Sequence, residues 1–147
     1  MDDVTARQDW MGLLARAWPE ELEACWRACG QDPAFEWIRP PEIGTAMLRG
    51  RAGAVGAPFN LGEMTVTRCA LVLECGTEGH AHVQGRDKSK ARIAALCDAL
   101  MQTPAAETMH GDVLAPLAQS EAARRRARAE RAAATRVEFL TMTRGEP

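Results

Sequence analysis

The chain has 147 residues, the usual size of one domain, and 46% of them are hydrophobic, which is enough to form a core. Only 5% are aromatic, so we expect a core built mainly from Leu, Ala, Val, Met and Ile. The net charge of −2 excludes a global attraction to nucleic acid or to a membrane surface. We therefore expect a single domain covering residues 1–147.

The charge is unevenly distributed along this chain. Residues 1–48 carry nine acidic residues and four arginines, whereas residues 121–136 carry six arginines and two glutamates. A basic helix on an otherwise acidic protein is typical of a docking surface.

The N-terminus predicts no export signal, because Met1-Asp2-Asp3 is acidic and no apolar core follows it. No apolar run approaches the roughly 20 residues that span a bilayer, so we expect a cytoplasmic protein without membrane contact. The five cysteines are odd in number and lack CxxC spacing, which predicts reduced thiols that act as small core residues. They are Cys25, Cys29, Cys69, Cys75 and Cys97.

Two helices are predicted at the N-terminal end. Apolar residues recur at helical spacing over residues 5–17, and Trp18-Pro19 interrupts the pattern. The second helix covers residues 20–29, with Pro19 at its first position and Gly30 ending it. Together the two helices are expected to form a hairpin.

Four strands are predicted next, over residues 35–39, 43–51, 64–75 and 79–85. Residues 64–75 are apolar on both faces, which indicates a central strand that is covered on both sides. Residues 74–78 contain Gly76 and predict a hairpin turn, so the last two strands should pair antiparallel.

The C-terminal half is predicted to be mostly helical. Residues 87–102 show the clearest helical pattern, 103–112 form a linker, and 116–135 form a helix of Ala and Arg. That last helix has little to bury, so we expect it to pack outside its own domain. A short strand is predicted over residues 137–143. The order indicates an α+β fold: an antiparallel sheet with an N-terminal helical hairpin, one helix packed on the sheet and a long Ala/Arg-rich helix near the C-terminus.

The turn Gly85-Arg86-Asp87-Lys88 is a candidate anion site. Gly85 allows close backbone approach, Asp87 is a predicted N-cap, and Arg86 and Lys88 place two cations beside the start of a helix. Cations in the first turn oppose the helix dipole, and a bound anion would offset that cost. The alternative is an ordinary capped connection with solvated cations.

Residues 50–63 form a second candidate, with glycines at 50, 53, 56 and 62 that can shape a concave anion nest. No Gly-Lys-Ser/Thr follows, so this is not a Walker loop, and flanking strands exclude a dinucleotide fingerprint. A long hairpin loop is the alternative, although a loop of about 12 residues favours a function.

Two further clusters complete the candidates. His80 and His82 share a strand face, but no cysteine or carboxylate nearby completes a metal site, so we predict a polar interface and no metal. Arg124, Arg128 and Arg131 share a helix face without interleaved aromatic residues, which favours a protein interface or a solvated face over nucleic acid. No nucleophile system is evident, and the catalytic residues stay unassigned.

These residues carry a resemblance to a known family. The matching stretches, in chain order, are Arg7-Gln8 with Trp10-Met11, Ile38-Arg39 with Glu42 and Gly44, Gly62-Glu63 with Thr65 and Thr67-Arg68, Val83-Gln84-Gly85-Arg86-Asp87-Lys88, Asp98-Ala99-Leu100-Met101-Gln102, Ala115-Pro116-Leu117, and residues 136–145. In this order and spacing the chain resembles the PhnG family, a small subunit of the bacterial carbon–phosphorus lyase system.

The resemblance implies a non-autonomous subunit of the alpha-D-ribose 1-methylphosphonate 5-triphosphate synthase complex, which is inactive alone and acts in phosphonate catabolism when phosphate is scarce. That complex transfers a phosphonate to ribose C1 of ATP and releases adenine, so ATP, with Mg, is its substrate and this chain holds no cofactor of its own. The alternative is a purely structural subunit without substrate contact.

The partners implied are the nucleosidase-like, radical and small sister subunits, in a core with two copies of each. The residues implied to place an anionic substrate are Arg51, Arg68, Gly85, Arg86 and Lys88. Those implied to form the partner interface are Arg124, Arg128, Arg131, Phe139, Met142 and Arg144.

Overall fold

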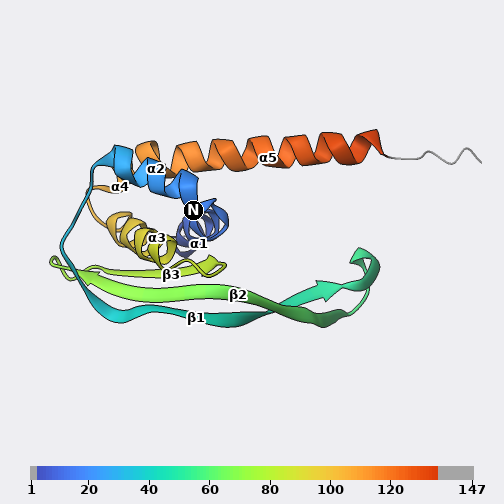
Figure 1. Ribbon diagram of the computed structural model, residues 1–147, viewed down its shortest axis with the longest axis horizontal. Helices are drawn as coiled ribbons and strands as arrows, with labels where there is room; N and C mark the ends of the chain where they lie inside the picture. The colour runs from blue at the N-terminus through green and yellow to red at the C-terminus, as the bar shows by residue number, and fades with distance from the viewer. Residues whose placement is uncertain (1–2, 136–147) are drawn as a thin grey trace, which may run out of the picture.

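The computed structural model describes residues 3–135 and has helices on one side of a three-stranded antiparallel sheet (Figure 1). The strands are β1 (Phe35–Arg51), β2 (Pro58–Leu73) and β3 (Glu78–Gln84), in the order β1-β2-β3. The turn between β2 and β3 holds Gly76 at φ 83°, a conformation that glycine adopts without strain. The predicted fold class and the antiparallel hairpin are confirmed.

The first strand is longer than predicted. Residues 35–39 and 43–51 belong to one strand, because two register shifts, on either side of Arg39, let the chain pass through Pro40 and Pro41 without leaving the sheet. Proline is tolerated there because β1 is an edge strand, so neither proline needs to donate to a second neighbour.

The predicted loop over residues 50–63 was also wrong. β2 begins at Pro58, so only residues 52–57 lie between the strands, and they include the short 3₁₀ turn η1 (Ala52–Ala54). Phe59 pairs with Gly50 and Gly62 pairs with Leu48 across the ladder. Gly50 and Gly62 obscure the strand pattern in the sequence, and each pairs with a larger residue on the other strand.

Two helices open the chain, α1 (Asp3–Arg16) and α2 (Pro19–Cys29). Pro19 occupies the start of α2 and Gly30 ends it in the left-handed region at φ 66°, both as predicted. Each of the two helices packs on α3 (Lys88–Leu100), so α3 is the centre of the helical layer.

The core lies between α3 and the sheet. From Lys90 to Leu100 every residue of α3 except Arg92 is buried. Gly79 on β3 permits this contact, because a Cβ atom there would lie 2.1 Å from the carbonyl oxygen of Ala95. The sheet and α3 therefore approach at a separation that only glycine allows.

The segment predicted as a linker, residues 103–112, is largely helical. It contains α4 (Ala106–Met109) and the start of the π-helical turn η2 (His110–Leu114), which leads into α5 (Ala115–Ala134). Met109 and Val113 are buried in the core, which explains why this segment is ordered. Its short elements carry too few apolar residues to give a period in the sequence.

The helix α5 matches the predicted Ala/Arg helix closely. Leu117 is its buried residue, and every residue from 125 to 134 is exposed. Figure 1 shows α5 continuing past the other helices, in the direction in which the β1–β2 hairpin extends. The strand predicted over residues 137–143 lies outside the described residues, as do Phe139, Met142 and Arg144.

All five cysteines are free thiols. Cys69 and Cys97 are core residues as predicted, and Cys69 donates its S–H to the carbonyl oxygen of Ala91 at 3.2 Å. Cys25 and Cys29 are partly buried against the core. Cys75 is exposed at the β2–β3 turn, so the prediction of a core position was wrong for that residue. Within residues 3–135, no helix is long and apolar enough to cross a membrane.

Candidate functional site

The turn after β3 is held in place from inside the sheet. Gly85 has φ 89°, and its N–H donates to the carbonyl oxygen of Thr65 at 3.0 Å. The buried Thr67 hydroxyl donates to the Gly85 carbonyl oxygen at 2.7 Å and accepts from the Asp87 N–H at 3.1 Å. Thr67 therefore fixes the backbone on both sides of Arg86.

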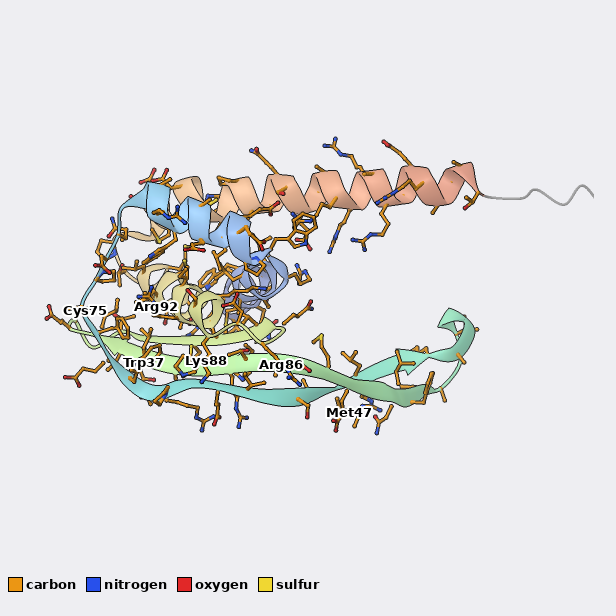
Figure 2. The ribbon with its side chains drawn as sticks, viewed as in Figure 1. Trp37, Met47, Cys75, Arg86, Lys88 and Arg92 are labelled. Atoms are coloured by element: carbon orange, nitrogen blue, oxygen red, sulfur yellow. The ribbon has the colours of Figure 1, made fainter. Side chains whose placement is uncertain are left out.

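The predicted cap is confirmed, because the Asp87 carboxylate accepts from the Lys90 N–H at 2.8 Å. Arg86 and Lys88, the residues before and after Asp87 in the sequence, are both exposed and are labelled in Figure 2. Among the described residues neither side chain forms an ion pair. The turn thus presents two unpaired cations on a rigid backbone, an arrangement suited to an anion.

The third cation of this segment has a different role. Lys90 is buried, and its ammonium donates to the carbonyl oxygen of Ala15 at 2.8 Å, in the last turn of α1. Burial lowers the pKa of Lys90, and the nearby Asp87 opposes that shift. A cation at a helix C-terminus interacts favourably with the helix dipole. Lys90 therefore has an acceptor inside the protein, and its place in the first turn of α3 does not require a bound anion.

A cavity of about 320 Å³ lies between α5 and the end of β3. Its lining residues are Arg16, Trp18, Gln84, Glu121, Arg124, Arg125 and Arg128. Gln84 directly precedes Gly85, so the arginines of α5 border the same region as the Gly85 turn. Sequence reasoning had treated the two clusters as separate, because nearly 40 residues part them along the chain.

Arg124 holds α5 against α2. Its guanidinium contacts both carboxylate oxygens of Glu21 at 2.9 and 2.7 Å and lies 4.6 Å from the centre of the Trp18 ring. Burial acts to raise the pKa of Glu21, but the hydrogen bonds from Arg124 and Ser120 outweigh it and the pKa is lowered. Sequence reasoning placed Arg124 in a partner interface, and the structure gives it an internal partner.

The other arginines of this helix differ in their contacts. Arg16 of α1 forms an ion pair with Glu121 at 2.8 Å and thereby lowers the pKa of Glu121, and Arg125 reaches the same carboxylate at 3.4 Å. Arg128 lines the cavity without an ion pair among the described residues. Arg131 donates to the carbonyl oxygen of Ala127 at 3.3 Å, further along the exposed part of α5.

Arg68 lies elsewhere, on the sheet surface opposite the helices. Its Nε donates to Glu42 at 2.6 Å, and its Cα partner on β3 is His82. Burial lowers the pKa of His82, and the neighbouring charges of Arg68, His80 and Arg39 lower it further. The two histidines do share a polar strand face, and residues 3–135 contain no group of three metal-ligand side chains.

Arg51 lies at a third place, the tip of the β1–β2 hairpin. Its guanidinium donates to the carbonyl oxygen of Gly56 at 3.3 Å and so bridges the connection between the strands. Of the five predicted anion-site residues, the structure therefore groups Gly85, Arg86 and Lys88 and leaves Arg51 and Arg68 apart from them.

One buried charged cluster was not predicted. The carboxylate of Asp98 is fully buried and accepts from the Arg7 guanidinium at 3.1 and 2.7 Å, the Trp10 indole at 2.9 Å and the His80 N–H at 2.9 Å. These contacts join α1, α3 and β3. The sequence did contain one sign of this cluster, an Asp within an apolar helix, because a buried carboxylate needs hydrogen-bond or charged partners.

The fold and this surface define a small α+β protein with two exposed cations on a fixed turn after β3, near a cavity lined by arginines of α5. A family model, "Phosphonate metabolism protein PhnG", matches residues 5–145. The "Alpha-D-ribose 1-methylphosphonate 5-triphosphate synthase subunit PhnG" of Rhizobium meliloti (strain 1021) is 46% identical over 147 residues, covering 97% of this chain and 92% of the relative. The chain belongs to the PhnG family.

Proposed function

We propose that this protein is a non-autonomous subunit of an alpha-D-ribose 1-methylphosphonate 5-triphosphate synthase complex in phosphonate catabolism. The observation that carries the proposal is 46% identity to a subunit of that name over 97% of this chain. Sister subunits of the carbon–phosphorus lyase core, nucleosidase-like and radical among them, are its proposed partners, with two copies of each core subunit.

The proposed reaction joins a phosphonate oxygen to ribose C1 of ATP while the bond from C1 to adenine breaks. ATP, with Mg, is a substrate of the complex, and this chain contributes no cofactor. The catalytic groups come from the sister subunits, which is why the chain is inactive alone. This chain contributes binding groups to the transfer.

The proposed substrate contact is the Gly85 turn. Arg86 and Lys88 are exposed and unpaired among the described residues, while Thr67 and Asp87 fix the backbone that carries them. Fixed cations lose little entropy on binding, and charge-assisted hydrogen bonds to phosphate are among the strongest in proteins. A triphosphate or a phosphonate supplies the matching oxygens.

A purely structural role is the second candidate, and the arginine contacts favour it. Arg68 and Arg124 both form ion pairs with carboxylates of this chain at 2.6 and 2.7 Å. By the same chemistry, Arg86 and Lys88 would bind carboxylates of a sister subunit and never meet substrate.

The double variant Arg86→Ala/Lys88→Ala separates the two roles. When it is coexpressed with the sister subunits, we expect complete assembly and a fall in synthase activity of about 10- to 100-fold, since a hydrogen bond to a charged group contributes roughly 1.5–3 kcal/mol. Activity and copurification are measured on the same preparation, with Arg27→Ala at an exposed residue of α2 as the control. Loss of copurification would favour the structural role, and unchanged activity in an assembled complex would remove the turn from the mechanism.

A further inference from the structure

The distal part of the β1–β2 hairpin, residues 46–64, has no third strand and is called the hairpin arm here. β3 pairs with β2 only as far as Val66 and Gln84, whereas the β1–β2 ladder continues from Ala46 and Met64 to Arg51 and Pro58. Figure 1 shows this part extending beyond the helical layer. None of its described side chains is buried. A two-stranded ribbon without a core is at best marginally stable in water.

The hairpin arm nevertheless carries large apolar side chains. Their exposed fractions are 53% for Met47, 39% for Leu48, 91% for Val55, 44% for Phe59 and 66% for Leu61. Figure 2 shows Met47 on this unsupported part of the hairpin. Methionine and aromatic residues are enriched in protein interfaces, and clustered exposed apolar residues mark binding surfaces. The arm has the composition of a contact surface.

The free edge of β1 is protected against pairing with another strand. Pro40 and Pro41 lack backbone donors, and register shifts occur on both sides of Arg39 and again between Leu48 and Arg49. Prolines, bulges and charged residues are the usual means of blocking sheet extension. Only the shift between Leu48 and Arg49 lies within the hairpin arm, so the arm is distinguished by its exposed apolar side chains and not by a protected edge.

A second surface projects on the same side of the molecule. Residues 125–134 of α5, called the helix arm here, are all exposed and carry four arginines and one glutamate, a net charge of +3. Figure 1 shows that the helix arm and the hairpin arm extend in the same direction from the helical layer. One partner can therefore reach an apolar surface and a cationic surface together.

We propose that both arms bind a single sister subunit, at a surface where an apolar patch is flanked by carboxylates. The apolar side chains of the hairpin arm supply the desolvated centre of the interface, and the arginines of the helix arm face the acidic residues. The inference rests on the proposed function for the existence of the sister subunits. The inference adds that the hairpin arm and the helix arm contact the same sister subunit, and that the contacted surface is apolar with flanking carboxylates.

The apolar contact is tested with Met47→Ser/Leu61→Ser in the full chain coexpressed with its sister subunits. We expect binding to the partner to weaken at least tenfold while the thermal unfolding midpoint of the chain alone stays unchanged, because neither side chain is buried. Val4→Ser, at an equally exposed residue of α1, is the matched control and should bind normally. Normal binding by the hairpin variant would overturn the proposal.

The charge contact is tested with Arg126→Glu/Arg131→Glu in the helix arm. We expect at least tenfold weaker binding at low salt and a shallower dependence of affinity on salt concentration, because the interaction is electrostatic. Arg27→Glu, a reversal at an exposed residue of α2, is the control. An affinity and salt dependence equal to those of the parent chain would contradict the acidic partner surface.

Photo-crosslinking identifies what covers the arms. A photoreactive residue replaces Leu61 in one preparation and Arg131 in another, and both should crosslink to the same sister subunit. Crosslinks only to residues 136–147, only to a second copy of this chain, or to two different subunits would overturn the proposal. If the parent chain neither copurifies with the sister subunits nor supports synthase activity, the proposed function itself fails. An active, assembled complex whose arms form no crosslink refutes this inference alone.

Discussion

The carboxylate of Asp98 on α3 is a buried charge that accepts four hydrogen bonds from two other segments of the chain. A buried ion pair contributes little net stability when it is intact, but removing one partner leaves the other uncompensated. Arg7 and Trp10 come from α1, and the His80 N–H comes from β3. The cluster therefore fixes how α1 and β3 sit on α3.

We predict that Asp98→Asn lowers the free energy of unfolding by about 3 kcal/mol or more, because the buried ion pair between Asp98 and Arg7 is broken. Urea unfolding followed by circular dichroism measures the change. The control is Asp9→Asn, since Asp9 is exposed on the same helix that carries Arg7. Equal stability of Asp98→Asn and the parent chain would show that the buried charge is dispensable.

Sequence reasoning succeeded for residues whose roles are local. Asp87 caps α3 by accepting a hydrogen bond from an N–H three residues later in the chain. Gly30 and Gly76 adopt positive φ where the chain must turn. It failed where the partner is remote. Lys90 donates to Ala15, 75 residues earlier, and Arg124 contacts Glu21, 103 residues earlier. Helical spacing places Lys90, unlike Lys88, on the face of Ile93 and Cys97, but it does not identify the remote acceptor.

At the scale of elements, the separation of α3 from the sheet depends on Gly79. We predict that Gly79→Ala lowers the free energy of unfolding by roughly 1–3 kcal/mol, because the new methyl group meets the Ala95 carbonyl and forces the elements apart. Thermal and urea unfolding measure the effect. Gly44→Ala is the matched strand control, since no atom lies within 4 Å of a Cβ there. If Gly44→Ala lowered the free energy of unfolding by as much, the effect would come from replacing a strand glycine and not from the contact with α3.

The attachment of α5 should depend on pH. The folded protein lowers the pKa of Glu21, so the carboxylate binds fewer protons in the folded than in the unfolded state. Its contribution is present above the ordinary pKa of 4.5 and is lost as the pH falls through the lowered value. We predict that Glu21→Gln reduces the loss of unfolding free energy between pH 6 and about pH 3.

Urea unfolding across that pH range tests the role of Glu21. Glu23→Gln on the same helix is the control, because Glu23 is more exposed and lies 3.3 Å from Arg27 across one helical turn. A pH dependence of Glu21→Gln identical to that of the parent chain would contradict the predicted contribution of the Arg124 ion pair.

Elements were predictable where apolar periodicity is strong, as in α3, and less so where composition obscures it. Pro40, Pro41, Gly50 and Gly62 suggest breaks, yet cross-strand pairing keeps the chain extended at all four residues. Residues 106–114 form short helical turns because Met109 and Val113 enter the core, a tertiary cause that no local pattern contains.

At the scale of the whole molecule, the α+β class and the α5 helix with little to bury were both predictable from the order of elements. The grouping of surface charges was not, because it depends on which strands and helices become neighbours. Arg51, Arg68 and Arg86 were predicted to act together, yet they lie at the hairpin tip, on the outer sheet surface and at the turn after β3. Of that predicted set the fold groups Gly85, Arg86 and Lys88, and it adds the neighbouring cavity beside α5, which the sequence did not indicate.

The two buried charged side chains of α3 both depend on the first helix. Lys90 donates to Ala15, and Asp98 binds Arg7 and Trp10. A chain shortened by residues 3–16 would leave a buried ammonium and a buried carboxylate without these partners. N-terminal truncation would therefore destabilise α3, which follows the Gly85 turn, and a shortened protein that fails to support synthesis would say nothing about the chemistry of Arg86.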